Sequence, residues 1–298
     1  MALVVGLQED RAVLWPGDDR LATTLVCLEG EWAIMQQALA VAIDAAHAAG
    51  RAIRELYGRD ISITQKGASG PVTEADLASN ACIHGILLQA FPDDGWLSEE
   101  TADRPDRISR SLVWIVDPID GTRAFMTGNP DWSIAIGLLL NGRLTLGVVH
   151  APAHGMLYEA AAGAGAFRNG ARLQVSSRPS LGGARVTGPK PLIDQLARNS
   201  GPIERVARIP SLALRLARVA EGSVDVGLVS ADARDWDLAA ADLILFEAGG
   251  RVTALDGKPL VYNRPEPIHR ELAAAPARLH PSVVAAMRAV SAEGVAQR

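Results

Sequence analysis

The sequence predicts an α/β protein whose two halves are built differently. The N-terminal half has two long helix patterns followed by apolar strands that meet in hairpins, which is typical of an α+β arrangement. In the C-terminal half, short strand patterns alternate with helix patterns, which is typical of an α/β arrangement. The 298 residues suffice for one large domain or two smaller ones. We expect an N-terminal extension over residues 1–30, an α+β domain over 31–165 and an α/β domain over 166–298.

Two helices are predicted before the first strands. Residues 31–57 have apolar side chains three or four positions apart, and Gly58 follows the last of them as a stop signal. Thr73 is a suitable N-cap for a second helix over residues 74–90. Asp76 in the first turn favours the same start, because an acidic group there interacts well with the helix dipole.

Strand patterns follow the second helix, and the dipeptide Asn141-Gly142 joins two of them as a strong hairpin signal. The strands and the further hairpin expected in this half cover residues 112–116, 132–140, 143–150 and 156–168. The strands expected in the second half cover residues 184–187, 224–229 and 250–254. The helices expected between them cover residues 191–199, 211–221 and 236–248.

Composition excludes several classes of partner. The net charge of −5 argues against a surface for polymeric nucleic acid, which requires an excess of Lys and Arg. No apolar run approaches the roughly 18–20 residues needed to cross a bilayer, so no membrane partner is expected. The two cysteines, Cys27 and Cys82, are too few for a disulfide framework and favour a cytoplasmic setting.

The most informative stretch is WIVDPIDGT at residues 114–122. Three apolar residues end a buried strand, and Asp117 and Asp120 follow, three positions apart. Two carboxylates in a low-dielectric site repel each other, so a hard divalent cation is their natural partner. The amides of Gly121 and Thr122 come next and can point at an anion if a helix starts there. Carboxylates for a metal beside amides for a phosphate predict a metal-assisted phosphatase.

Three further acidic residues sit at the edges of apolar elements. Glu99 and Glu100 follow an apolar segment, and Asp237 lies at the start of a predicted helix. Taken singly, each has a simpler structural interpretation, as a solvated loop end or a first-turn helix acid. Taken with the two aspartates of the strand, they can converge around Mg²⁺, which prefers six oxygen ligands and keeps substrate phosphate in its shell.

These motifs resemble those of the inositol monophosphatase superfamily over about residues 32–275. The segments that carry the resemblance are PVTEAD at 71–76, LSEET at 97–101, DPIDGT at 117–122, WDLAA at 236–240 and EAGG at 247–250. The resemblance implies a Mg²⁺-dependent phosphomonoesterase that acts on a small phosphorylated metabolite. It also implies a layered αβαβα sandwich and a homodimer.

The resemblance also implies a set of metal ligands. Glu99, Asp117 and the carbonyl of Ile119 would hold a first Mg²⁺. Asp117, Asp120 and Asp237 would hold a second. Two Mg²⁺ ions are therefore expected, with an additional, weaker one in some members of the family.

The catalytic roles are carried over in the same way. Thr122, together with Glu99, Asp117 and the metals, would orient and activate the attacking water. The amides of Gly121 and Thr122 would bind the phosphate oxygens of the substrate. Lys66 matches a lysine that the family keeps before the second helix.

One departure from the family pattern bears on the mechanism. The family has an aspartate in the loop just before the second helix, where this chain has Ala68 and Gly70. That aspartate helps to bind the additional Mg²⁺ and partners the catalytic threonine. The third ion and the partner of Thr122 are therefore open, with Glu74 and Asp76 as candidate substitutes.

The substrate remains open between several small phosphate esters. The segments at 123–125 and 130–132 resemble bacterial members that act as inositol monophosphatase, 3′(2′),5′-bisphosphate nucleotidase or histidinol phosphatase. The nucleotidase reaction is preferred, followed by inositol-1-monophosphatase, with histidinol-phosphatase as the alternative. Ser230 stands near the position of an acidic residue that recognises inositol in some members. Arg215 is interpreted first as a solvated arginine on an amphipathic helix and second as a contact for another phosphate.

A function of another class competes with the enzyme. The missing loop aspartate also fits a catalytically weak protein that binds a phosphorylated ligand or a protein partner as a regulator. Replacing Gly70 or Ala68 with Asp separates the two interpretations, because a gain in activity would identify the loop as the defect.

Overall fold

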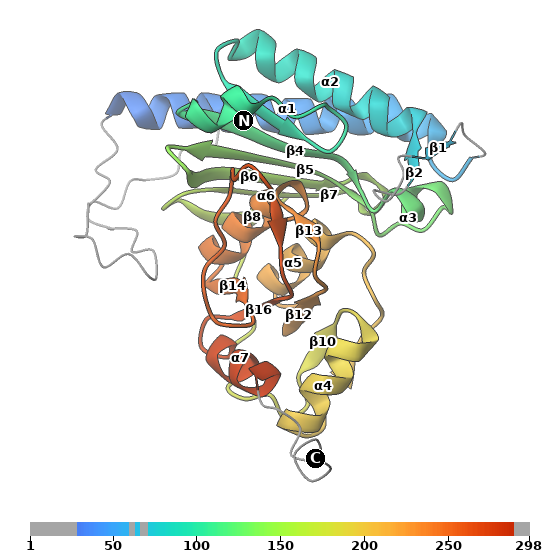
Figure 1. The fold of residues 1–298 in the computed structure, drawn as a ribbon, viewed down its shortest axis with the longest axis vertical. Helices are drawn as coiled ribbons and strands as arrows, with labels where there is room; N and C mark the ends of the chain where they lie inside the picture. Colours follow the sequence, from blue (N-terminus) through green and yellow to red (C-terminus); the bar gives the residue numbers. More distant parts are fainter. Residues whose placement is uncertain (1–28, 60–62, 66–70, 289–298) are drawn as a thin grey trace.

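The structure is a computed structural model that describes residues 29–59, 63–65 and 71–288. Its elements form five layers in the order helices, sheet, helices, sheet, helices (Figure 1). The αβαβα sandwich expected for this chain is therefore confirmed. Lys66, Ala68, Gly70 and nearly all of the expected N-terminal extension lie outside the described residues.

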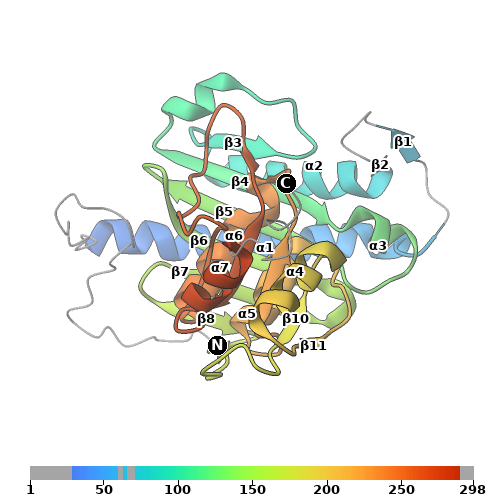
Figure 2. The same cartoon turned by 60° about the horizontal axis from the view of Figure 1, so that its bottom comes forward.

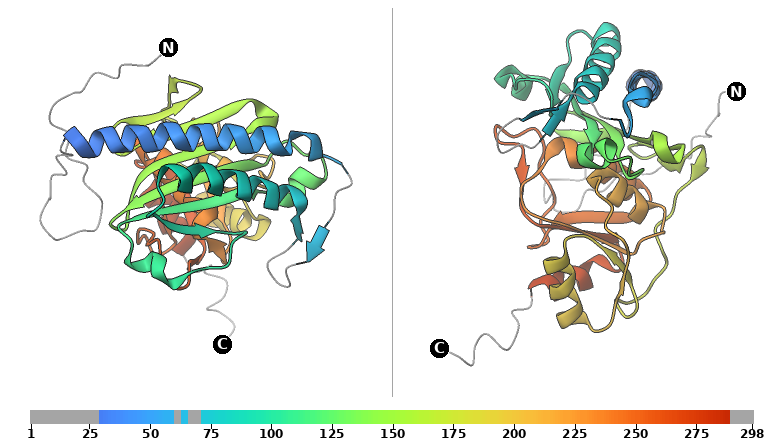
Figure 3. Two further views of the ribbon diagram at one scale, coloured as in Figure 1. Left: turned by 90° about the horizontal axis from the view of Figure 1, so that it is seen from above. Right: turned by 90° about the vertical axis from the view of Figure 1, so that its right-hand side faces the viewer.

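The first helical layer consists of α1 (Glu29–Ile53) and α2 (Glu74–Ala90), which lie side by side over one face of the larger sheet (Figure 3). Five alanines of α1 are fully or almost fully buried, and their small side chains allow close approach: Ala38, Ala42, Ala45, Ala46 and Ala49. The single 3₁₀ turn η1 (Arg54–Leu56) extends α1. The helix predicted from periodicity and the helix predicted from the cap at Thr73 are both confirmed.

The larger sheet has seven strands in the order β3-β4-β5-β6-β7-β8-β9. Their bounds are β3 (Gly95–Ser98), β4 (Leu112–Asp120), β5 (Ser133–Leu140), β6 (Arg143–Ala151), β7 (Met156–Ala161), β8 (Gly165–Arg168) and β9 (Ala171–Arg172). Only the pair β3–β4 is parallel. Asn141 and Gly142 both have positive φ, at 52° and 78°, which confirms the expected hairpin turn.

The middle layer places α5 (Leu212–Ala220) and α6 (Asp235–Glu247) between the two sheets. Close approach of α6 to β6 requires glycine, because a Cβ on Gly147 would lie 2.3 Å from the carbonyl oxygen of Ala240. Gly137 on β5 meets Ala239 in the same way. This packing fixes the first turn of α6 near the strand ends where the acidic motif lies.

The smaller sheet has five strands in the order β11-β10-β12-β16-β14, and it is covered by α4 and α7 (Figure 2). The bounds are β10 (Arg185–Thr187), α4 (Lys190–Ser200), β11 (Glu204–Arg205), β12 (Val226–Val229), β14 (Gly250–Ala254), β16 (Leu272–Pro276) and α7 (His280–Arg288). The remaining elements are β1 (Ile63–Gln65), β2 (Pro71–Thr73), η3 (Pro105–Ser109), α3 (Thr122–Met126), η4 (Pro152–His154), β13 (Ala233–Arg234) and β15 (Ile268–His269). None of the described helices is long and apolar enough to span a membrane.

Candidate metal centre

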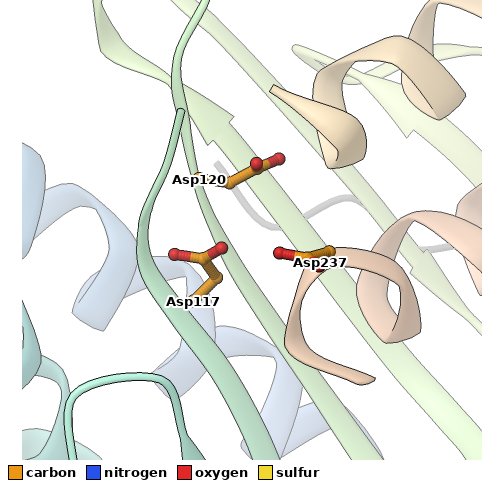
Figure 4. A group of neighbouring side chains, drawn as sticks. All are labelled: Asp117, Asp120 and Asp237. Atoms are coloured by element: carbon orange, nitrogen blue, oxygen red, sulfur yellow. The ribbon is translucent and has the colours of Figure 1, made fainter. Parts of the chain in front are cut away.

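A β-bulge at the end of β4 shapes the site. Asp117 pairs with Ala135 of β5, and the next pair is Asp120 with Ser133, so the bulged strand has one extra residue. Pro118 lies inside the bulge, where its missing N–H costs no ladder hydrogen bond. In a regular strand, residues three apart point to opposite faces. The extra residue brings Asp117 and Asp120 to the same side (Figure 4). The strand expected to end at residue 116 therefore runs four residues further.

The third aspartate comes from α6. Asp237 faces the two strand aspartates, and one carboxylate oxygen from each of the three residues lies within 4.8 Å of the others (Figure 4). Its Oδ2 accepts a hydrogen bond of 2.7 Å from the amide of Arg234, which orients the carboxylate at the helix start. Asp117 and Asp120 are buried. The structure thus brings together three of the predicted metal ligands.

Glu99 directly follows β3 and lies near this group of aspartates. The parallel pairing of Ser98 with Val116 places Glu99 beside Asp117, and its amide donates to the Val116 carbonyl at 3.4 Å. Burial, followed by repulsion from Asp237, raises the pKa of Glu99 to about 8. Glu99 therefore faces the same cluster as the aspartates.

The aspartates carry an electrostatic cost. Burial first, and then repulsion from Glu99, raise the pKa of Asp117 well above its ordinary value. Burial and then repulsion from Asp120 raise the pKa of Asp237 to about 7. The pKa of Asp120 is also raised by burial, although hydrogen bonds of 2.6 Å from the Ser211 hydroxyl and the Ala213 amide work against this shift. In the part of the chain that the structure describes, none of the three aspartates forms an ion pair with Lys or Arg.

The donor set fits a hard divalent cation. Carboxylate oxygens and a backbone carbonyl are the ligands that Mg²⁺ and Ca²⁺ take. The bulge is folded tightly, because the Ile119 amide donates to Asp117 Oδ1 at 3.0 Å. The Ile119 carbonyl accepts a hydrogen bond of 3.2 Å from the Thr122 hydroxyl and retains a second lone pair. A bound cation would also relieve the repulsion between the carboxylates.

The Gly-Thr pair forms a sharp turn into α3. Gly121 has φ +94°, and a Cβ there would lie 3.3 Å from the Asp131 carbonyl oxygen, so glycine is required. The amides of Gly121 and Thr122 have no acceptor among the described residues. The Thr122 hydroxyl is 3.1 Å from Asp76 Oδ1. The phosphate-binding role of the two amides stays a prediction, whereas the contact with Asp76 joins Thr122 to one of the two candidate substitutes.

Sequence reasoning missed Ser211 as part of the site. Its hydroxyl donates to Asp120 and accepts from the Leu214 amide at 2.9 Å, so it is the N-cap of α5 as well as a support for the aspartate. The expected helix over 211–221 begins at this serine, and its capping role could have been predicted. The contact with Asp120 could not, because 91 residues separate the two.

The preferred interpretation of Arg215 was wrong. Its side chain is 2% exposed, because α5 lies between the two sheets and has no solvated face there. The guanidinium donates to the carbonyls of Ile209 and Leu228, at 2.5 and 2.9 Å. Burial lowers the pKa of Arg215 to about 10. These backbone carbonyls thus accept from guanidinium N–H groups of Arg215 that would have to bind a second phosphate in the alternative interpretation.

Comparisons with known proteins agree with this geometry. Residues 34–292 match the profile of the Inositol monophosphatase family. The Nus factor SuhB of Haemophilus influenzae is 39% identical over 233 residues, covering 74% of this chain and 86% of that protein. The histidinol-phosphatase of Chlorobaculum parvum is 35% identical, covering 75% of this chain and 90% of that protein. The inositol-1-monophosphatase of Rhizobium meliloti is also 35% identical, covering 74% and 88%.

Solved structures show the same fold. The extragenic suppressor protein suhB of Bartonella henselae superposes with a TM-score of 0.75 at 29% identity, over 85% of this chain and 98% of that chain. An IMPase of Thermotoga maritima superposes with a TM-score of 0.72 at 29% identity, over 86% and 96%. The chain therefore belongs to the inositol monophosphatase family of phosphatases.

Proposed function

We propose that the protein is a Mg²⁺-dependent phosphomonoesterase that hydrolyses a small soluble phosphate ester. The observation that carries the proposal is a group of three aspartates, the buried Asp117 and Asp120 at the bulge of β4 and the half-buried Asp237 of α6, which have no cationic side chain paired with them in the described residues. Mg²⁺ is proposed because it favours oxygen ligands and keeps places for substrate phosphate and water.

The residues that would hold the ions are those expected from the resemblance. Glu99, Asp117 and the Ile119 carbonyl would hold one Mg²⁺, and Asp117, Asp120 and Asp237 the other. A third, weaker ion has no assigned ligand set, because the loop that would contribute to it lies outside the described residues. When bound, the ions supply positive charge that lowers the pKa of water and stabilises charge developing on the phosphoryl group.

The residues of the chain would then position the reactants. Glu99 and Thr122 would hold the attacking water, and the Gly121 and Thr122 amides would hold phosphate oxygens so that the water approaches in line with the leaving oxygen. Ser211 keeps Asp120 in place through its 2.6 Å hydrogen bond. None of these steps requires a phosphorylated side chain.

For the substrate, we place inositol 1-phosphate first and histidinol phosphate second. Relatives are named for both activities, and the burial of Arg215 removes the support it gave to a bisphosphate. A nucleoside 3′(2′),5′-bisphosphate remains a third candidate substrate because of Arg234. Its guanidinium lies 5.9 Å from the Trp236 ring at the start of α6, and within the described residues its side chain donates no hydrogen bond.

The test is phosphate release by the purified protein with Mg²⁺ and with EDTA, across inositol 1-phosphate, histidinol phosphate, adenosine 3′,5′-bisphosphate and fructose 1,6-bisphosphate. We expect strong Mg²⁺-dependent release from one of them. No release from any of them, by a folded protein that binds Mg²⁺, would contradict the proposal. That result would favour the regulatory role, for which the relatives named Nus factor SuhB provide a reason.

We also propose a homodimer that works in the cytoplasm. The resemblance implies the dimer, and the low cysteine content is compatible with a reducing compartment. Sedimentation equilibrium of the full chain checks the dimer, and a mass of one chain across the micromolar range would contradict it.

A further inference from the structure

Asp235, the first residue of α6, is fully buried, and both of its carboxylate oxygens have partners within the chain. Oδ2 accepts a hydrogen bond of 2.7 Å from the amide of Asn263. Oδ1 accepts a hydrogen bond of 2.7 Å from Nε2 of His269, a side chain that is 6% exposed. Both partners belong to segment 262–269, so this carboxylate fastens the start of α6 to that segment.

The backbone of the same turn is paired with segment 262–269 as well. β13 and β15 form an antiparallel pair just before α6. The amide of Asp232 donates to the His269 carbonyl at 2.9 Å. The amide of Asp235 donates to the Pro267 carbonyl at 3.1 Å. Arg234 lies between these two amides, so its backbone is held from both sides.

The position of the Arg234 backbone matters for the metal centre. Its amide donates the 2.7 Å hydrogen bond to Oδ2 of Asp237 that orients this carboxylate. A shift of the turn would therefore move both the donor and the aspartate. Mg²⁺ demands near-ideal octahedral geometry with oxygen ligands at about 2.0–2.1 Å, so a small displacement of one ligand weakens binding.

Segment 262–269 is itself anchored by a buried arginine. Arg107 of η3 is 1% exposed, and it donates to Oδ1 of Asn263 at 2.5 Å and to the Arg264 carbonyl at 2.9 Å. Its Nε and Nη2 atoms also donate to the carboxylate of Asp103, at 2.6 and 2.9 Å. Arg107 and Asp103 belong to the connection between β3 and β4 that begins at Glu99. Segment 262–269 thus joins this connection to the start of α6.

We infer that Asp235 and His269 are positioning residues of the metal centre, which hold Asp237 in the geometry that binds Mg²⁺ by fastening the start of α6 to segment 262–269. This inference rests on the proposed Mg²⁺-dependent reaction. It adds a role for buried residues outside the expected ligand set. Partners of metal ligands commonly determine metal affinity in this way, because they fix the orientation of the ligands.

The experiment measures the Kd for Mg²⁺ by isothermal titration calorimetry of the full chain at pH 8. His269→Ala removes the donor to Asp235, whereas His269→Gln places an amide N–H near the position of Nε2. We expect His269→Ala to raise the Kd on the order of 10–100-fold and His269→Gln to keep it within about threefold of the wild type.

His280→Ala is the matched control for the loss of a buried histidine. His280 of α7 is 5% exposed, and its Nε2 lies 3.2 Å from the Thr253 hydroxyl, outside segment 262–269. We expect both alanine variants to lower the Tm of the metal-free protein, because both remove buried side chains. Only His269→Ala should weaken Mg²⁺ binding, so the comparison separates positioning from general stabilisation.

Asn263→Gly tests the anchor with little risk to the fold. Asn263 has φ +60°, a backbone conformation that glycine adopts readily, and its amide to Asp235 is kept. The substitution removes only the side-chain acceptor of Arg107. We expect the Kd for Mg²⁺ to rise about threefold or more, at the lower end of the range because Arg107 keeps its bond to the Arg264 carbonyl.

An unchanged Kd in His269→Ala, or an equal rise in His280→Ala, would overturn the positioning role. If His269→Ala does not fold, Asn263→Gly decides the question, and an unchanged Kd in that variant would overturn the role. A folded wild type that binds no Mg²⁺ would instead overturn the proposed metal centre. The two failures are distinguishable, because the second appears before any residue is replaced.

Discussion

Buried carboxylates in two regions of the molecule differ in how their charge is compensated. Asp225, just before β12, is fully buried and meets Arg178 Nε at 3.0 Å and Arg185 Nη2 at 3.2 Å. Burial alone would raise its pKa, but hydrogen bonds from the guanidinium and the amide of Arg185 outweigh burial and lower the pKa to about 2. This carboxylate is ionised at any physiological pH, and the protein neutralises it with its own arginines.

The three aspartates of the candidate metal centre show the opposite behaviour. Asp117, Asp120 and Asp237 gain hydrogen bonds from amides and a hydroxyl, yet burial still raises the pKa of each. An uncompensated charge of this kind destabilises the fold and persists where function requires it. The comparison teaches that burial alone does not identify a functional carboxylate. The distinguishing feature is that several carboxylates face one another with no cationic side chain beside them in the residues described.

The largest effect should come from Asp237→Asn, which removes one charge from the cluster while Oδ1 can still accept from the Arg234 amide. We expect kcat/KM to fall on the order of 10³-fold or more, because a ligand of the proposed ions is lost. We also expect the metal-free protein to become more stable by about 2 kcal/mol at pH 8, since a repelling buried charge is gone. Phosphate release and chemical unfolding measure the two effects. Retained activity would contradict the metal assignment.

The next effect concerns pH. Glu99 and Asp237 have pKa values near 8 and 7 in the folded protein, against about 4 when unfolded. Between about pH 4 and pH 8 the folded state holds protons on Glu99 and Asp237 that the unfolded state releases. The stability that these two protonated groups contribute is therefore present at low pH and is lost as the pH rises toward their folded-state pKa values. We expect the metal-free protein to lose on the order of 3 kcal/mol between pH 6 and pH 8.

Mg²⁺ provides the control for this pH dependence. A cation that binds the ionised carboxylates of the folded state adds stability by mass action, and it does so more strongly at pH 8 than at pH 6. Thermal unfolding with EDTA and with saturating Mg²⁺ at both pH values measures this difference. An equal Tm gain at pH 6 and pH 8 would mean that the ion binds elsewhere.

Removing the carboxylate charge of Asp225, which pairs with two arginines, should change the stability in the opposite direction. Asp225→Asn removes the acceptor charge and leaves Arg178 and Arg185 without their partner, so we expect a loss of about 2–3 kcal/mol of stability. Because both arginines are about one-third exposed, the loss should fall below that of a fully buried pair. Equilibrium urea unfolding measures it. The kcat per folded molecule should stay unchanged, and a gain in stability would break the comparison between the two regions.

The sequence predicted the parts of the molecule that depend on local pattern. The long periodicity of α1, the capping residue Thr73 and the turn Asn141-Gly142 each specify a structure through neighbouring residues, and all three are confirmed. The acidic motifs were also local, because each carboxylate follows an apolar element. The assignment of these carboxylates to shared metal sites came from the family resemblance rather than from their spacing.

The rest depended on contacts between distant segments. β16 has the sequence LAAAP, without a β-branched residue, and becomes a strand because it pairs with β12 and β14 on either side. The pattern around Arg215 suggested a solvated face, but a second sheet covers that face. The bulge after Asp117 and the support of Asp120 by Ser211 likewise involve partners that no local pattern indicates.

The smallest effect tests the comparison within a single helix. Asp242 of α6 is buried, burial raises its pKa to about 7, and its one hydrogen-bond partner among the described side chains is the Tyr262 hydroxyl at 2.8 Å. It resembles the cluster in electrostatics but lies apart from the other carboxylates. Asp242→Asn keeps an acceptor for Tyr262 and removes the desolvated charge, so we expect a gain of about 1 kcal/mol at pH 8 and little change at pH 5.5, where Asp242 holds a proton in the folded state.

Urea unfolding of Asp242→Asn at both pH values measures that gain, with the Mg²⁺-induced shift in Tm as the second readout. The shift should equal that of the wild type, whereas Asp237→Asn should reduce it. A reduced shift in Asp242→Asn as well would mean that the ion responds to buried charge anywhere along α6. A normal shift would establish that a raised pKa marks the metal site only where several carboxylates face one another.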